Sequence, residues 1–109
     1  MEFERGTAMF LMIHAKAATR IGVVGASIES KNLFEIAAQQ AAATTGARIK
    51  LIWLAGAHSN HVDGRILVAD SSAVSGRSKV EARVRLEGRS RADLPAIRDA
   101  LVDVIQRLS

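Results

Sequence analysis

Residues 78–87, which read SKVEARVRLE, alternate between apolar and polar or charged side chains. This alternation is typical of a strand with one covered face and one solvated face. Residues 93–108 follow it with an apolar stripe at helical spacing. Because a half-covered strand needs a second layer, this pair predicts helices packed on one face of a sheet. The stripe consists of Leu94, Ile97, Leu101, Val104, Ile105 and Leu108.

Two more strands and another helix are predicted earlier in the chain. Residues 20–27 are rich in Ile and Val and end in small residues, which indicates a strand. Residues 32–44 have apolar side chains at helical offsets, and Gly46 marks the end of that helix. Residues 47–55 alternate again and predict a second strand. The residues that share apolar faces here are Leu33, Phe34, Ile36, Ala37, Ala41, Ile49, Leu51 and Trp53.

The middle of the chain is predicted to hold a turn, a short strand and a short helix. The turn covers residues 56–60, the strand 61–63 and the helix 65–75. The element order is then β-α-β-β-α-β-α, an α+β fold with a four-stranded sheet and three helices on one face. Residues 20–109 are expected to form one domain, and residues 1–19 a tail or lead-in segment.

Composition excludes several classes of function. The chain of 109 residues is 49% hydrophobic and contains no cysteine, so it forms no disulfide and carries no thiol nucleophile. The apolar run at residues 8–13 is too short to cross a membrane, and acidic residues precede it, so no export signal or membrane contact is predicted. No nucleophile-base pair or cofactor loop is evident. We therefore expect a cytoplasmic protein that is not an enzyme and has no catalytic residues or cofactor.

Two segments in this order resemble the HPr family, the small phosphocarriers of the bacterial sugar phosphotransferase system. VRLEGRSRADLPAIRDALVDVI is similar to the final strand, Glu-Gly turn and last helix of that family. HVDGRILVADSSAVSG resembles the short strand and middle helix. The resemblance covers residues 20–108 and implies an HPr-like open-faced β-sandwich.

The HPr family carries its phosphoryl group on a histidine at the start of the first helix. In the matching register, Glu29 stands at the histidine position, and Lys31 and Asn32 stand at the arginine and proline positions. The resemblance therefore implies a degenerate phosphocarrier site, in which the carboxylate is a built-in phosphate mimic. Ile66 similarly replaces the regulatory serine of the middle helix. The degenerate site comprises Glu29, Ser30, Lys31 and Asn32.

Ordinary helix capping is an alternative interpretation of the same stretch. Asn32 followed by Glu35 resembles a capping box, and Ser30 is another candidate cap. Under this interpretation the polar residues at 30–32 only begin a helix.

The resemblance implies a non-catalytic domain that acts through contacts with a protein partner. Its partner surface would combine the first helix start with the middle helix, where the candidate contact residues are Arg65, Ile66, Leu67 and Val68. The alternative is a basic sheet face that binds nucleic acid or another polyanion. The net charge of +4 is concentrated at residues 77–91, where Lys79, Arg83 and Arg85 are the candidate binding residues. A solvated face with cross-strand ion pairs explains the same charges.

Two histidines three residues apart, His58 and His61, invite comparison with a metal site. They lie in a predicted turn, and Asp63 is the one further ligand nearby in sequence. We therefore predict surface histidines and no metal site.

Overall fold

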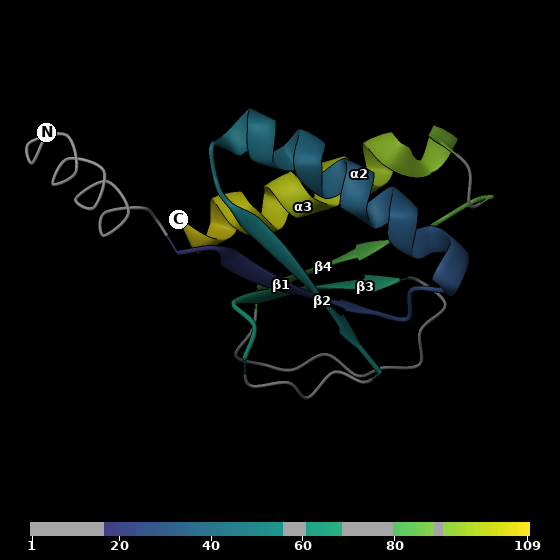
Figure 1. Cartoon of the computed structure of the whole chain (residues 1–109), viewed down its shortest axis with the longest axis horizontal. Coiled ribbons are helices and arrows are strands. Elements are labelled where there is room, and N and C mark those ends of the chain that lie inside the picture. Colours follow the sequence, from purple (N-terminus) through teal and green to yellow (C-terminus); the bar gives the residue numbers. More distant parts are fainter. Residues whose placement is uncertain (1–16, 56–60, 69–79, 89–90) are drawn as a thin grey trace, which may run out of the picture.

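Four parallel strands form the sheet of this domain, and two helices cover one of its faces (Figure 1). The computed structural model describes residues 17–55, 61–68, 80–88 and 91–109. The strands lie in the order β2-β1-β3-β4. The elements are β1 (Thr19–Val24), α2 (Ile28–Thr45), β2 (Ile49–Leu54), β3 (Gly64–Val68), β4 (Val80–Val84), the 3-10 turn η1 (Arg91–Asp93) and α3 (Leu94–Leu108).

The β1-α2-β2 segment is a βαβ unit, because parallel neighbours need a crossover connection. From β2 the chain passes to β3, on the other side of β1, so the order of strands reverses between β1 and β3. No described helix is long and apolar enough to cross a membrane.

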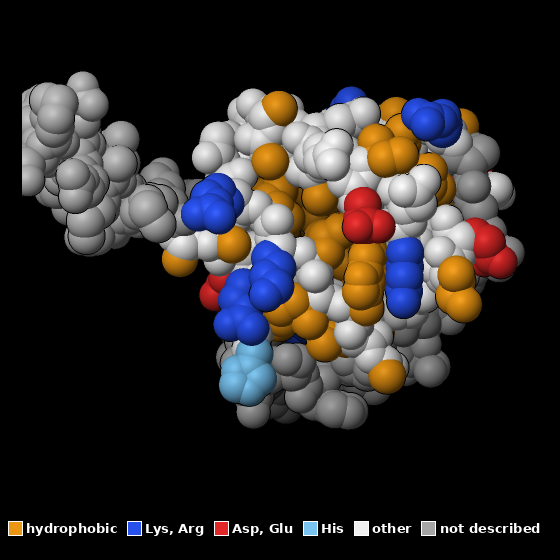
Figure 2. Space-filling view, viewed as in Figure 1, with side chains coloured by type: hydrophobic (Ala, Val, Ile, Leu, Met, Phe, Trp, Pro, Cys, Tyr) orange, Lys and Arg blue, Asp and Glu red, His pale blue; other side chains and the backbone are white. Residues whose placement is uncertain are grey.

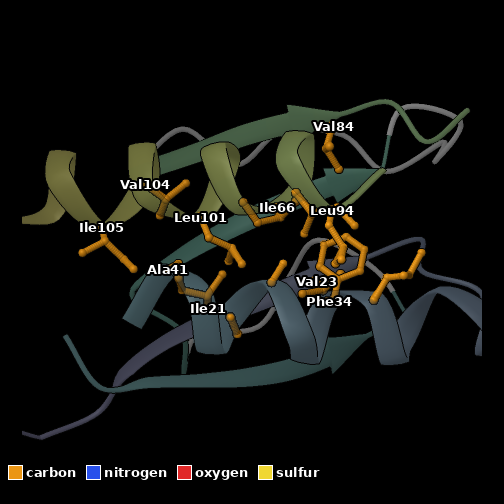
Figure 3. Close-up of a cluster of buried hydrophobic side chains, with 14 residues drawn as sticks. Ile21, Val23, Phe34, Ala41, Ile66, Val84, Leu94, Leu101, Val104 and Ile105 are labelled. Carbon is orange, nitrogen blue, oxygen red and sulfur yellow. The ribbon is translucent and has the colours of Figure 1, made fainter. Parts of the chain in front are cut away.

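The core lies between the sheet and the two helices (Figure 3). Ile21, Ile66 and Leu101 have no exposed surface and represent β1, β3 and α3. From α2, Phe34 supplies a large ring, and its other buried positions are mainly alanines, which allow α3 to approach closely. These alanines are Ala37, Ala38 and Ala41.

Several predictions are confirmed. The final helix is found at Leu94–Leu108, with Pro95 in its first turn, and its stripe is buried except at its last position, which is partly covered. In β2, Ile49, Leu51 and Trp53 pack toward the core while Lys50 is exposed. The four-stranded sheet is also confirmed, but two α-helices, instead of the predicted three, lie on one of its faces in the described part of the chain.

The prediction for the middle of the chain is wrong. Residues 65–68 belong to strand β3 instead of a helix, and residues 61–63 precede that strand instead of forming one. The error has a physical cause: Ile66, Leu67 and Val68 are a continuous apolar run, as expected of a parallel strand covered on both faces. Such a run cannot be distinguished from a buried helix by its periodicity. Residues 69–79 lie outside the described chain.

The sheet face opposite the helices is solvated only in part: Arg20, Lys50 and Arg83 are exposed there, but the centre of the face is buried. Val24 and Leu67 belong to that face, because their strand neighbours Val23 and Ile66 point into the helix-covered core, yet they are 1% and 0% exposed. The same face holds Arg65, which is 1% exposed and forms an ion pair with Glu81 at 3.6 Å. The sheet is therefore covered on both faces at its centre.

Candidate functional site

The turn from β1 into α2 consists of three small residues, Gly25, Ala26 and Ser27. Gly25 has a φ of 88°, a conformation that residues with a Cβ rarely adopt. Ser27 is the N-cap of α2, and its Oγ accepts a hydrogen bond from the amide of Ser30 at 3.3 Å. The helix therefore begins at Ile28, four residues earlier than predicted.

The side chain of Ser30 is completely buried beneath this helix start. Its hydroxyl donates to the carbonyl oxygen of Ser27 at 3.0 Å and accepts from the Ser27 hydroxyl at 3.2 Å. The two serines thus satisfy each other and fix the turn. The helix start is capped, as the alternative interpretation predicted, but the cap is Ser27 instead of Ser30 or Asn32.

A turn after β4 faces the start of α2. The amides of Glu87 and Gly88 donate to the two carboxylate oxygens of Asp93, at 3.0 and 3.2 Å. Asp93 is 5% exposed and immediately precedes α3. A buried carboxylate therefore holds the Glu87-Gly88 turn against the last helix.

Between these two turns lies a hollow of about 460 Å³, which we call the carboxyl-edge crevice. Residues Gly25, Ser27 and Ser30 line it from the β1-α2 side, and the end of β3 contributes Val68. Leu86, Glu87 and Gly88 line it from the β4 side. The crevice therefore lies at the carboxyl ends of β1, β3 and β4, beside the reversal of strand order.

A smaller hollow of about 260 Å³ lies at the carboxyl ends of β1 and β2, and Lys31 and Trp53 are among the residues that line it. The ammonium group of Lys31 lies 5.4 Å from the centre of the Trp53 ring, and Phe34 meets that ring edge to face. Lys31 is therefore engaged with an aromatic ring of the neighbouring strand.

The structure separates the residues predicted for a degenerate phosphocarrier site. Glu29 and Asn32 are exposed on the first turns of α2, Ser30 is buried, and Lys31 is half-buried over Trp53. Only Ser30 of these four lines the carboxyl-edge crevice.

The predicted partner surface on the middle helix is wrong, because its residues belong to β3. Arg65, Ile66 and Leu67 are at most 1% exposed. Only Val68 reaches a hollow, as part of the crevice. The regulatory-serine position assigned to Ile66 is therefore a core position.

Two of the three predicted polyanion-binding residues, Arg83 and Arg85, are exposed, while Lys79 lies outside the described residues. Glu81 lies between Lys79 and Arg83 in the sequence, and its carboxylate forms an ion pair with the buried Arg65.

Among the described residues, no group of three or more His, Asp or Glu side chains is suited to hold a metal ion. Asp63 accepts a hydrogen bond from the amide of Arg20 at 2.9 Å. His58 lies outside the described residues.

Gly25 and Asp93 belong to or support the candidate site and were not predicted, whereas Gly88 was predicted only as part of a Glu-Gly turn. The three small residues of the β1-α2 turn, at positions 25–27, follow an apolar strand in the sequence. They fit the end of a strand that continues to Ser27 as well as they fit a turn. The contact between Asp93 and the Glu87-Gly88 turn depends on how the chain folds back after β4, and no sequence pattern marks it.

Comparisons with family models, with curated proteins and with solved structures find no match to this chain. The parallel sheet and the strand at Gly64–Val68 also give the HPr resemblance no support from the fold.

Proposed function

We propose that this chain is a binding domain that holds a small ligand in the carboxyl-edge crevice. The observation that carries the proposal is the position of the hollow: it lies outside the carboxyl ends of parallel strands, where their order reverses. In open α/β sheets this is the place where ligands bind, because the connections diverge there and leave a crevice. The volume of about 460 Å³ is also typical of small-molecule sites.

The lining favours a ligand that forms hydrogen bonds. Ser27, which is partly exposed, and Glu87, which is exposed, are the polar side chains of the lining, while Val68 and Leu86 provide apolar contact. Glycines at positions 25 and 88 bring the backbone itself to the surface of the crevice. A small molecule with an apolar body and a polar rim fits this combination.

The walls are held in place before any ligand arrives. The paired serines fix the β1-α2 turn, and Asp93 fixes the turn after β4. A site with prearranged walls loses little conformational entropy on binding, which favours affinity.

A screen of small polar and amphipathic fragments, monitored by amide NMR, tests the proposal. We expect bound fragments to shift the amide resonances of Gly25, Ser27, Ser30 and Gly88. Gly88→Leu should abolish these shifts, because Gly88 lines the crevice and a larger side chain there can be added without a clash, since a Cβ meets no atom within 4 Å. Gln39→Leu adds the same side chain to an exposed site on α2 and should leave binding intact. Fragments that bind elsewhere, that bind Gly88→Leu equally well, or that do not bind at all would refute the proposal.

A second candidate function is docking of a protein partner at the start of α2, as the sequence suggested. The observation in its favour is Ile28, which is 83% exposed at the first position of the helix. Ile28 is the one large apolar side chain exposed in the described part of the chain, and apolar side chains supply the buried core of protein interfaces. The proposed docking surface is therefore centred on Ile28 and no longer includes residues 65–68, which belong to β3.

Quantitative affinity capture from cell extract tests this second function. The result expected is a specific protein retained by the native chain and by Gln39→Glu, and lost from Ile28→Glu. If every captured protein is retained equally by Ile28→Glu, the docking function is wrong.

A further inference from the structure

Three basic residues meet at the amino edge of the sheet, where β1 and β2 begin. Arg20 of β1 and Lys50 of β2 are direct partners in the parallel register, so their side chains share one face. Arg48 stands two residues before Lys50, and its carbonyl oxygen accepts a hydrogen bond from Thr19 at 2.6 Å. We call Arg20, Arg48 and Lys50 the amino-edge basic patch.

All three side chains are exposed. Figure 2 shows Lys and Arg side chains gathered, together with a histidine, on the side of the molecule where β1 and β2 begin. Within the described residues, Arg20 and Lys50 form no ion pair, whereas Arg98 and Arg107 are paired with Asp99 and Asp103 on their own helix.

Asp63 lies beside Arg20 but is tied to the backbone. Its carboxylate accepts from the Arg20 amide at 2.9 Å, and its own amide donates to the Arg20 carbonyl at 2.7 Å. The positive charges of Arg20 and Lys50 therefore remain available at the surface.

Like charges directly opposite each other on neighbouring strands destabilise a sheet. The pair Arg20–Lys50 therefore has a cost that an anion bound between the two side chains would remove. We propose that the amino-edge basic patch binds the phosphate backbone of nucleic acid.

The character of the patch favours nucleic acid over an acidic protein. Protein interfaces are centred on apolar and aromatic side chains, and all three members of this patch are charged. Phosphate backbones are bound through charge alone, without regard to base sequence, and the arginine guanidinium matches phosphate geometry. The site is distinct from Lys79, Arg83 and Arg85, the residues that the sequence suggested, and it lies at the sheet edge opposite the carboxyl-edge crevice.

Fluorescence anisotropy with a labelled oligothymidylate of about 20 nucleotides tests the proposal on the full chain, at several salt concentrations. The decisive variant is Arg20→Gln with Lys50→Gln, which removes two charges and relieves the like-charge pair. The matched control is Arg83→Gln with Arg85→Gln, which removes the same charge from exposed residues of β4 and the segment after it.

We expect the native chain and the control to bind at low salt and the Arg20/Lys50 variant to bind about tenfold more weakly. The slope of log affinity against log salt should also fall by about 1.4 in that variant, since each phosphate contact on a single strand contributes about 0.7. Circular dichroism and thermal unfolding establish that both variants are folded.

Three results would overturn the proposal. Equal losses in the two double variants would mean that net charge alone attracts the oligonucleotide. A loss confined to the Arg83/Arg85 variant would transfer the site to β4. Displacement of the oligonucleotide by polyglutamate of the same length at equal or lower concentration would indicate an acidic protein partner instead.

Discussion

The two helices of this domain begin in different ways, although both have a polar residue at the N-cap. Ser27 caps α2 with its own side chain, which accepts from the amide of Ser30. Asp93 precedes α3, and its side chain forms no capping hydrogen bond there. Its carboxylate instead accepts from Glu87 and Gly88, in the turn before the helix. The Ser27 side chain thus bonds within its own helix start, whereas the Asp93 side chain bonds to the turn five and six residues before it.

The two helix starts each support one wall of the carboxyl-edge crevice, which lies between the β1-α2 turn and the turn after β4. The serines hold the β1-α2 turn, and Asp93 holds the turn after β4 at a separation that the sheet sets. The β1-α2 turn also has backbone bonds of its own, because the Ser27 carbonyl oxygen accepts from the amides of Ser30 and Lys31 at 3.1 and 3.2 Å. The comparison predicts that Asp93 contributes more to stability than Ser27, because the Asp93 side chain accepts hydrogen bonds from two backbone amides and the Ser27 side chain from one.

The largest effect is expected from Asp93→Ala. This change leaves the amides of Glu87 and Gly88 without their acceptor and should lower the free energy of unfolding by about 2 kcal/mol. Asp93→Asn keeps one carbonyl oxygen and should lose about half as much. Urea denaturation followed by circular dichroism measures both values. If Asp93→Ala were as stable as the native chain, the carboxylate would have no structural role in this turn.

The two helix starts also differ in how well the sequence predicts them. The apolar stripe places the start of α3 within one residue, because large apolar residues recur at helical spacing from Leu94 onward. The same reasoning places the start of α2 four residues late. Its first turn breaks the pattern: apolar Ile28 is exposed and polar Ser30 is buried. Periodicity assumes the reverse, so it could not find this turn.

The prediction for the middle strand failed for a related reason. Apolar residues at 66–68 carry no alternation because both sheet faces are covered there, so strand and helix look alike in sequence. The alternation of apolar and polar side chains also does not tell which strands pair or in which direction. The parallel arrangement, and the crevice that depends on it, were therefore not predicted. The candidate site is therefore assembled largely from features that appear only when distant turns are brought together.

Ser27→Ala should produce the next largest effect. Loss of the cap leaves the Ser30 amide without its side-chain acceptor and should cost about 1 kcal/mol of unfolding free energy. Ser27→Asp keeps an acceptor at the same position and should retain most of the stability. Thermal and urea unfolding compare the three proteins. A Ser27→Ala protein less stable than Asp93→Ala would reverse the ranking of the two helix starts.

A smaller effect is expected from the coupling between Ser27 and Ser30. Each hydroxyl is a partner of the other, so after Ser27→Ala the further change Ser30→Ala should cost less than it does alone. A double-mutant cycle should give a coupling of about 0.5 kcal/mol or more. The same cycle between Ser27 and Asp93, whose bonds share no partner, should give a value near zero, and substantial coupling there would show that the two turns act as one unit.

The smallest effect on stability is expected at Ile28. Its side chain is 83% exposed, so Ile28→Gln removes little buried apolar surface, and the unfolding free energy should change by less than about 0.5 kcal/mol. Leu33→Gln, one and a half turns further along the same helix, replaces a residue that is 5% exposed and serves as the contrast, with a loss of several kcal/mol. A large loss at Ile28 would mean that this residue is a structural part of the helix start. If Ile28→Gln leaves stability unchanged but loses a captured partner, the proposed binding role of the α2 start is independent of folding. The same test cannot be made at the first turn of α3, because its apolar residue Leu94 is buried.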